Sequence, residues 1–227
     1  MNTQRNAENT AVELRARLRQ ARAELTSDQR SRGSLLMRAR FFTWLNVARE
    51  QAQEAGLPKP SRVAAFWPMA DEPDLLPLLS QWADADDITL CLPAVVEPNA
   101  PLEFRPWMPD TPMRVGPYGV KEPENGPVLL PDVLLVPTLG YTLQGDRLGY
   151  GGGYYDRTLA SLSAQGHTFT TIGVAWDCGL LDADYKAAPH DISLDAIITP
   201  DGWIPDAPLN THTSSGRPLK PRTYILR

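Results

Sequence analysis

Apolar residues recur at helical spacing near the start of the chain, and arginines fill the other faces of the helix that this pattern predicts. The apolar positions are Leu14, Leu18, Ala21 and Leu25. Thr10, with Glu13 three residues later, has the residue types of a capping box and predicts the start of this helix. Thr26 marks a second start, which predicts a longer helix ending near Gly56.

Short apolar runs alternate with helical patterns over the next part of the chain. The runs predict buried strands at residues 63–67, 88–92, 102–107, 132–137, 171–176 and 195–199. Helices are expected at residues 74–83 and 154–165, and residues 108–131 form an excursion rich in proline and glycine. The alternation predicts an α/β fold of three layers, with helices on both faces of a mostly parallel sheet. Ligands of such sheets bind beyond the carboxyl ends of the strands, so a site is expected at that edge.

The composition bounds the size and partners of the protein. With 227 residues, 42% of them hydrophobic, the chain can bury a good core, and a single domain is expected at residues 1–202. Residues 203–227 are rich in Pro, Ser and Thr and are expected to form a tail, with a weak strand signal in the final residues Tyr-Ile-Leu-Arg. The net charge of −5 and the pI near 5.2 argue against a general nucleic-acid-binding surface.

The cysteines and the N-terminus indicate a compartment. Cys91 and Cys178 lie far apart, and the chain has no CxxC motif, so a disulfide framework or zinc cluster is not expected. The N-terminal residues are polar, with no apolar signal core, and no run approaches the length of a membrane span. We therefore expect a cytoplasmic monomer with no membrane partner and no nucleic-acid partner.

Candidate chemistry concentrates in residues 147–157, which read RLGYGGGYYDR. Four glycines stand between Arg147 and a predicted helix start, and glycine lets backbone N–H groups approach a ligand closely. A helix N-terminus adds unpaired donors and partial positive charge, which favour a phosphate or a carboxylate. Asp156, early in that helix, is placed for a metal ion that bridges phosphates. This combination predicts a site for nucleotide phosphates.

The same glycines are also compatible with a hairpin or a flexible loop. Aromatic and charged residues at fixed places around them are unlike a Gly/Ser linker, which favours the binding site. The run matches neither GxxxxGK[ST] nor a GxGxxG after a strand. A nucleotide would therefore be bound outside the P-loop and dinucleotide-binding families.

The run RLGYGGGYYDR, after a predicted strand, resembles the signature of the 5-formyltetrahydrofolate cyclo-ligase family. Further matches follow in the family's order: Leu14-Arg15, AFWPMADEPD at 65–74, YGVKEP at 118–123, GVAWDCGLL at 173–181 and PHDISLDAIITP at 189–200. The glycine signature is specific to the family, whereas the other segments are individually weak but correctly ordered. The resemblance spans roughly residues 12–200 and leaves the tail unmatched.

The resemblance implies an enzyme that uses ATP and Mg²⁺ to convert 5-formyltetrahydrofolate, with or without a polyglutamate tail, to 5,10-methenyltetrahydrofolate, ADP and phosphate. An N-formyl group is a poor electrophile because the nitrogen lone pair stabilises it. Transfer of a phosphoryl group to its oxygen makes the carbon open to attack by N10 of the folate. Such a step asks the protein mainly for positioning and charge neutralisation. No Ser-His or Cys-His pairing is evident in the chain, which agrees with that demand.

The resemblance also implies roles for individual residues, by their place in the family's motifs. ATP would be bound by Arg15, Arg147, Leu148, Gly149, Tyr150, Gly151, Gly152, Gly153, Tyr154 and Tyr155. The substrate would be contacted by Trp67, Glu72, Tyr150, Gly151, Gly152, Gly153 and Tyr154. Arg147 and Tyr154 would be the catalytic residues, and Asp156 and Asp191 the magnesium ligands. Glu72 would bind the pterin, whose amino and amide N–H groups suit a carboxylate.

Each of these residues also has a purely structural interpretation. Asp156 would interact favourably with the helix dipole, and Asp191 would cap a turn. Arg15 is one of four arginines on its helix and would be solvated, while Glu72 would be an acid near a helix start. For Trp67, stacking on the folate and packing in the core are equally favoured interpretations. At least one of the loop tyrosines would pack at the helix start.

The chain departs from the family pattern at two places. Ala11 stands where the family usually has a lysine, so that either Arg15, Arg17 or Arg19 compensates or this end of the nucleotide site is weaker. Tyr141-Thr142 replaces a common Phe-Asp. Ala11 slightly favours a non-catalytic folate- or nucleotide-binding paralogue, whereas the intact loop favours the enzyme. An isomerase or acyl-CoA transferase of related fold is a third alternative, because fold does not fix function.

Overall fold

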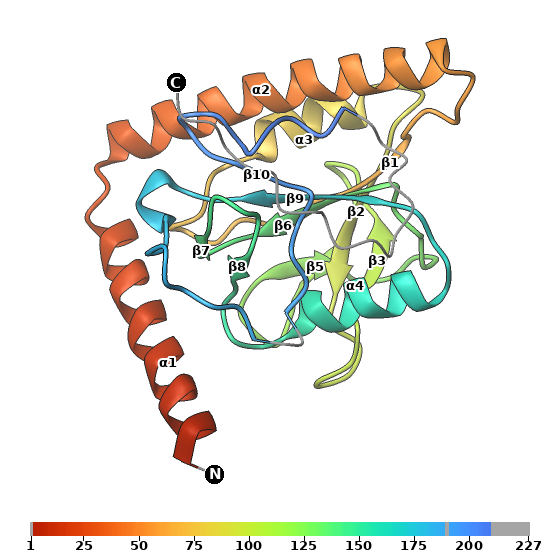
Figure 1. Ribbon diagram of the computed structural model, residues 1–227. Helices are drawn as coiled ribbons and strands as arrows, with labels where there is room; N and C mark the ends of the chain where they lie inside the picture. The colour runs from red at the N-terminus through yellow and green to blue at the C-terminus, as the bar shows by residue number, and fades with distance from the viewer. Residues whose placement is uncertain (1, 189–190, 210–227) are drawn as a thin grey trace.

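Seven strands form the central sheet of the computed structural model, which describes residues 2–188 and 191–209 (Figure 1). In spatial order they are β11 (Trp203–Ile204), β10 (Ala196–Ile198), β9 (Thr170–Val174), β6 (Val133–Pro137), β1 (Arg62–Ala64), β2 (Thr89–Ala94) and β3 (Glu103–Pro106). The strands between the two edges are parallel, and β3 and β11 pair antiparallel to their neighbours. In the central register, Val63 of β1 lies between Val133 of β6 and Leu90 of β2.

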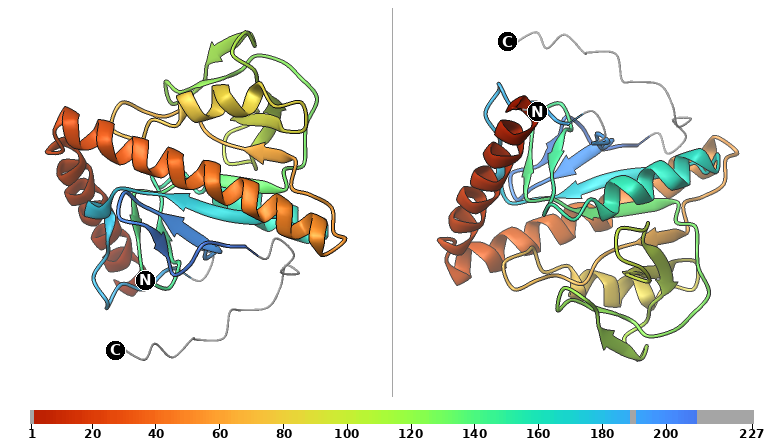
Figure 2. Two further views of the ribbon diagram at one scale, coloured as in Figure 1. Left: turned by 90° about the horizontal axis from the view of Figure 1, so that it is seen from above. Right: turned by 90° about the horizontal axis from the view of Figure 1, so that it is seen from below.

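Helices cover both faces of the sheet (Figures 1 and 2). The helices are α1 (Asn2–Ala23), α2 (Ser27–Glu54), α3 (Leu76–Ala83), α4 (Tyr154–Ala164) and the 3₁₀ turn η1 (Asp177–Gly179). The long helix α2 and the short α3 pack on one face, where they bury a cluster around Phe41 and Leu79. Helix α4 buries Leu159 and Leu162 on the other face. The α/β class and the three layers expected from the sequence are confirmed.

The predicted start is correct for α2 but not for α1. The predicted second start at Thr26 is confirmed: the side chain of Thr26 accepts from the backbone of Gln29, and the Gln29 side chain accepts from the backbone N–H of Thr26, which forms a capping box. The predicted start of the first helix at Thr10 is wrong, because α1 begins at Asn2. Residues 2–9 contain neither proline nor glycine, so nothing in them interrupts helical hydrogen bonding.

Several strands differ from their predicted lengths. Strand β1 ends at Ala64, and the apolar residues after it leave the sheet at its carboxyl edge. The excursion at 108–131 contains a hairpin of β4 (Met113–Val115) and β5 (Lys121–Pro123), and a second hairpin joins β7 (Gly140–Tyr141) to β8 (Arg147–Leu148). Strand β11 extends the sheet beyond the boundary expected at residue 202. The strand signal in the last four residues lies outside the described residues.

None of the helices in the described part of the chain is long and apolar enough to cross a membrane.

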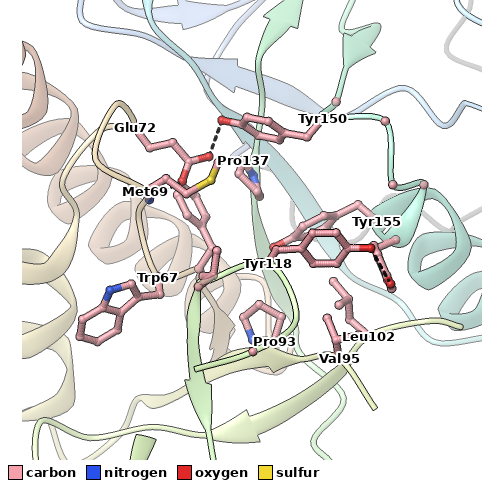
Figure 3. A pocket seen from close by; sticks show the side chains of 18 of the residues that line it. Trp67, Met69, Glu72, Pro93, Val95, Leu102, Tyr118, Pro137, Tyr150 and Tyr155 are labelled. Atoms are coloured by element: carbon pink, nitrogen blue, oxygen red, sulfur yellow. Dashed lines mark hydrogen bonds between the residues drawn. The ribbon is translucent and has the colours of Figure 1, made fainter. Parts of the chain in front are cut away.

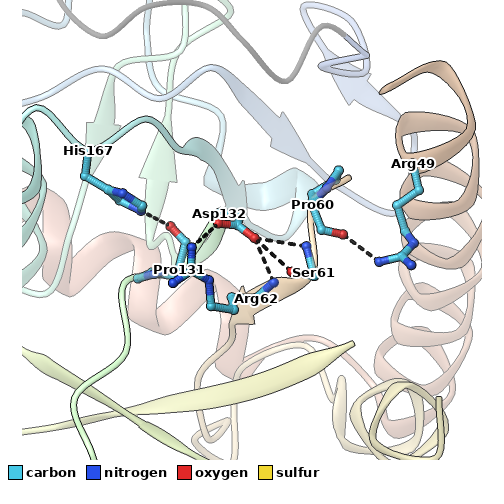
Figure 4. A network of polar contacts seen from close by, with 7 residues as sticks. All are labelled: Arg49, Pro60, Ser61, Arg62, Pro131, Asp132 and His167. Carbon is cyan, nitrogen blue, oxygen red and sulfur yellow. Dashed lines mark hydrogen bonds and ion pairs between the residues drawn. The ribbon is translucent and has the colours of Figure 1, made fainter. Parts of the chain in front are cut away.

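Asp132 ties together the amino ends of β1 and β6 (Figure 4). Its Oδ2 accepts from the backbone N–H groups of Ser61 and Arg62, each at 2.9 Å, and its Oδ1 accepts from the Arg62 guanidinium at 2.9 Å. Partial burial acts to raise the pKa of this carboxyl, but the two backbone donors and Arg62 outweigh it and hold the pKa below its usual range. The same edge is tied further by Arg49, which donates to Pro60 O at 2.6 Å, and by His167, whose Nε2 lies 2.8 Å from Pro131 O.

We expect Asp132→Asn to lower the free energy of unfolding by about 1–3 kcal/mol at pH 7, because a partly buried charge-assisted acceptor is lost. The folded pKa is depressed, so this stabilisation is present above the unfolded pKa and is lost as the pH falls through the folded value. The difference between wild type and variant in urea denaturation should therefore shrink below about pH 4. Asp110→Asn is the matched control, because Asp110 is exposed and should contribute less. Equal effects of the two substitutions would contradict the role of Asp132.

Candidate active site

A cavity of about 600 Å³ opens at the carboxyl edge of the sheet. Its wall is formed by the connection after β1, the ends of β2 and β6, the β4–β5 hairpin, helix α1 and the glycine loop at 149–153. Figure 3 shows these segments converging, with Glu72 and Met69 from the connection after β1 facing Tyr150 from the glycine loop. The cavity therefore lies where parallel α/β sheets bind their ligands.

The residues that the family resemblance nominated all lie on this wall. They are Arg15, Trp67, Glu72, Arg147, Leu148, Gly149, Tyr150, Gly151, Gly152, Gly153, Tyr154, Tyr155, Asp156 and Asp191. They come from four separate parts of the sequence, which the fold brings to one place. Their individual roles stay predictions.

The glycine loop takes a backbone shape that other residues would strain. Gly151 has φ +98° and Gly153, the N-cap of α4, has φ +63°, both in the region that favours glycine. A Cβ at Gly152 would lie 2.9 Å from the Tyr154 ring. The glycines thus let the loop turn tightly into α4 and leave the N-terminus of this helix at the cavity wall, where an anion is favoured.

Arg147 and Asp156 form an ion pair below the loop. Arg147 Nη2 donates to Asp156 Oδ1 at 2.5 Å, and both side chains are largely buried. Asp156 Oδ1 also accepts a longer hydrogen bond, 3.4 Å, from the backbone of Ile192. The pairing fixes the cation and the carboxylate next to each other on the cavity wall beside the glycine loop.

Asp156 and Asp191 are the carboxylates that this end of the cavity offers to a metal ion. Asp191 Oδ2 accepts from the backbone N–H of Ala188 at 2.8 Å, as expected for a residue that caps a turn. Within residues 2–188 and 191–209, no three His, Cys, Asp or Glu side chains cluster as a complete metal site. One or two carboxylates with nucleotide phosphates are, however, the usual ligand set of Mg²⁺. The donors present therefore fit a magnesium ion that arrives with ATP.

Arg15 is not a solvated surface arginine. It is half-buried, and its Nε donates to Gly149 O at 2.9 Å, so α1 holds the glycine loop directly. Of the other arginines considered as replacements for the lysine missing at Ala11, Arg19 reaches the cavity wall. Arg17 is exposed and pairs with Asp182 instead. Arg15 and Arg19 are thus the arginines of α1 that line the cavity.

Glu72 is a buried carboxyl on the cavity wall, in contact with Tyr150 of the glycine loop. Its Oε2 accepts from the backbone N–H of Met69 at 2.8 Å, and its Oε1 accepts from the Tyr150 hydroxyl at 2.5 Å (Figure 3). Burial raises the pKa of Glu72, opposed by these two hydrogen bonds and by the charge of Arg22. Burial likewise raises the pKa of Tyr150, which remains a neutral phenol that donates to the carboxylate.

Arg22 is the residue of this region that sequence reasoning missed. It is 1% exposed, and its Nη1 donates to the Tyr150 hydroxyl at 2.6 Å, while its Nη2 donates to Thr138 O. A signal was present in the helical spacing: Arg22 follows Leu18 by four residues and precedes Leu25 by three, so it lies on the apolar stripe. An arginine on a buried stripe needs a specific partner.

The β4–β5 hairpin contributes an aromatic and cationic wall. Trp67 is half-buried, lies edge-to-face against the buried Trp107, and has Lys121 Nζ 5.0 Å above its ring. Tyr118 at the hairpin tip places its hydroxyl 3.1 Å from that of Tyr154, which links the hairpin to the glycine loop. Tyr118 and Lys121 line the cavity but were noted in the sequence only as part of a matching turn.

The two cysteines do not line the cavity. Cys91 is fully buried, and burial raises its pKa to about 12, so it is an unreactive thiol as expected. Cys178 is half-buried. His190, which we interpreted as structural, lies outside the described residues.

Comparisons with known proteins identify the family of this chain. A model of the 5-formyltetrahydrofolate cyclo-ligase family matches residues 7–200. A 5-formyltetrahydrofolate cyclo-ligase of Mycolicibacterium smegmatis is 35% identical over 149 residues, which cover 61% of this chain and 73% of that protein. The protein of the same name from Escherichia coli K12 is 29% identical over 191 residues, covering 81% of this chain and 96% of that protein. The NMR structure of Aquifex aeolicus 5,10-methenyltetrahydrofolate synthetase aligns with a TM-score of 0.63 at 26% identity, over 92% of this chain and 96% of that chain. The chain therefore belongs to the 5-formyltetrahydrofolate cyclo-ligase family.

Proposed function

We propose that this protein uses ATP and Mg²⁺ to cyclise 5-formyltetrahydrofolate to 5,10-methenyltetrahydrofolate. The observation that carries the proposal is the single cavity in which the glycine loop, a cationic helix and a buried carboxyl meet. This combination matches a substrate with a polyphosphate at one end and a hydrogen-bond-donating ring at the other. Membership of the family gives the reaction its identity.

The chemistry needs positioning more than a protein nucleophile. The γ-phosphoryl group of ATP is transferred to the formyl oxygen, N10 of the folate attacks the formyl carbon, and phosphate leaves with the former formyl oxygen. Negative charge accumulates on the phosphoryl oxygens, where fixed donors stabilise it. Arg147, Arg15 and the backbone N–H groups at the start of α4 supply such donors at the cavity wall. Magnesium held by Asp156 and Asp191 would supply further positive charge there.

The folate would occupy the other end of the cavity. The Glu72 carboxylate accepts from the amino and amide N–H groups of the pterin, in the manner of other bidentate carboxylate contacts. Trp67 presents a half-buried ring to the cavity and is available to stack on the substrate. Tyr154, next to the glycines and linked to Tyr118, lies where the two substrates would meet.

A non-catalytic paralogue that binds the same ligands is the second candidate. Ala11 favours it, because a cation common in the family is missing from α1. The position of Arg19 on the cavity wall opposes it, since a second guanidinium remains near the loop.

The experiment that separates these functions follows absorbance in the methenyl-folate band after purified protein is mixed with 5-formyltetrahydrofolate and Mg-ATP. Growth of the band only in the complete mixture, and not without ATP or without Mg²⁺, establishes the cyclo-ligase. A flat trace from folded protein that binds both ligands establishes the paralogue. A flat trace without binding refutes both.

We expect Asp156→Asn to impair the use of Mg-ATP on the order of tenfold or more, because the proposed metal ligand loses its charge. Titration of Mg²⁺ at fixed ATP and folate measures the effect as a raised magnesium requirement. Asp182→Asn is the matched control, because Asp182 is exposed and pairs with Arg17 away from the loop. A wild-type magnesium dependence in Asp156→Asn, with the fold intact by thermal melting, would remove Asp156 from the metal site.

We expect Glu72→Gln to weaken folate binding by roughly 10- to 100-fold and ATP binding much less, because an ionic acceptor for the pterin becomes a neutral amide. Calorimetric titrations with each ligand measure the two affinities separately. The glutamine side chain has nearly the same size, so the surrounding packing is preserved. A larger loss for ATP than for folate would contradict the assignment of Glu72 to the pterin.

A further inference from the structure

We propose that Arg22 is a positioning residue for folate recognition: it orients the Tyr150 hydroxyl proton onto Glu72 and so keeps Glu72 an acceptor for the pterin. This inference rests on the proposed function, because it assumes that Glu72 meets the folate ring. Arg22 itself is not among the residues that line the cavity and acts through Tyr150.

The direction of each hydrogen bond follows from the donor chemistry. A guanidinium has donors only, so in the 2.6 Å contact Arg22 Nη1 must donate and Tyr150 Oη must accept. A phenol has a single proton, and the second close partner of Tyr150 is Glu72 Oε1 at 2.5 Å. That proton therefore points at the carboxylate. Because the hydroxyl is polarised by the cation behind it, it is a better donor than a phenol alone.

The orientation of the Tyr150 hydroxyl proton matters because the Glu72 side chain is buried. Its Oε2 already accepts from Met69, so Tyr150 and Met69 together satisfy one lone pair on each oxygen. The remaining lone pairs are available to a ligand in the cavity that Glu72 lines. A protonated Glu72 would instead donate, and would oppose the donor groups of a pterin.

The charges around Glu72 come from several elements. Burial raises the pKa of Glu72 and Asp71 beside it raises it further, whereas Met69, Tyr150 and the Arg22 charge lower it. Tyr155 of α4 also faces this carboxyl, and Arg19 lies over the Tyr150 ring. Arg22 is the arginine that acts on Glu72 through a direct hydrogen-bonded chain. Without it, burial is less opposed, and the pKa of Glu72 rises.

A purely structural role for Arg22 is the competing explanation. Its second nitrogen donates to Thr138 O, after β6, so Arg22 also anchors the end of α1 to the sheet. Loss of that anchor would lower stability and disturb the glycine loop as a whole. The positioning role predicts a shifted pH dependence of folate activity and a raised KM for folate alone. The purely structural role predicts an unshifted pH dependence and raised KM values for both folate and ATP.

The test measures kcat/KM for 5-formyltetrahydrofolate from pH 5 to pH 9, and KM for ATP, in wild type, Arg22→Gln and Arg22→Lys. In Arg22→Gln we expect the folate KM to rise about tenfold and the ATP KM to stay nearly unchanged. Glu72 binds folate in its ionised form, so kcat/KM for the folate falls as the pH drops through the pKa of Glu72. This acid limb of the pH profile should move to higher pH when Arg22 is removed. Arg22→Lys keeps the charge and should return the acid limb part of the way to its wild-type pH. Arg17→Gln, on an exposed site of the same helix, is the control.

A double-mutant comparison adds an independent readout. Tyr150→Phe removes the hydroxyl through which Arg22 acts, so Arg22→Gln should raise the folate KM no further in that background. Additive effects of the two substitutions would overturn the proposal. So would an unshifted acid limb with equal rises in both KM values and a lowered melting temperature, because that is the result of a lost anchor.

Failure of the proposed function gives a different result from failure of this inference. If wild type binds the folate without turnover, calorimetric affinities over the same pH range replace kcat/KM, and the same shift in Arg22→Gln supports the role of Arg22. A wild-type protein that neither converts nor binds the folate overturns both proposals. A wild-type pH profile in an active Arg22→Gln overturns the inference alone.

Discussion

The parallel pairing of β1 with β6 is the constraint on which the rest of the site depends. Val63 lies beside Val133 in the sheet, so the two connections that follow these strands emerge at the same edge. One connection carries Glu72, and the other leads through the β7–β8 hairpin to the glycine loop. Asp132, directly before β6, secures this register from the opposite edge by accepting from Ser61 and Arg62 at the start of β1. A slip of the pairing would separate Glu72 from the glycine loop.

Charged groups of both signs line the cavity. Arg147 is paired with Asp156, and Arg15 lies on the same wall as the start of α4. Glu72 also lies on this wall, where the Tyr150 hydroxyl of the glycine loop donates to it. Under the proposed function, this wall would hold a nucleotide and a folate next to each other, which is what phosphoryl transfer to the formyl oxygen requires.

The sequence predicted the parts of this structure that depend on local pattern. The alternation of apolar runs and helical segments was sufficient for the three layers, and the start signal at Thr26 placed the start of α2. The glycine motif identified the loop because its residue types are needed for the backbone itself. The hairpin at 113–123 was missed because its strands are three residues each and lie among prolines, where periodicity carries no information. Contacts such as Tyr118 with Tyr154 depend on tertiary packing alone.

Arg22 shows why a site residue can be hidden among similar neighbours. Arg15, Arg17, Arg19 and Arg22 look alike in sequence, yet their burial differs according to the face of α1 that each occupies. A buried guanidinium is costly unless its donors are bonded; Nη1 and Nη2 of Arg22 donate to Tyr150 and Thr138, whereas its buried Nε has no hydrogen-bond partner among the described residues. An apolar residue at this position would pack the helix equally well without desolvating a charge. The retention of a cation here is therefore better explained by what it does to Tyr150 and Glu72 than by the stability of α1.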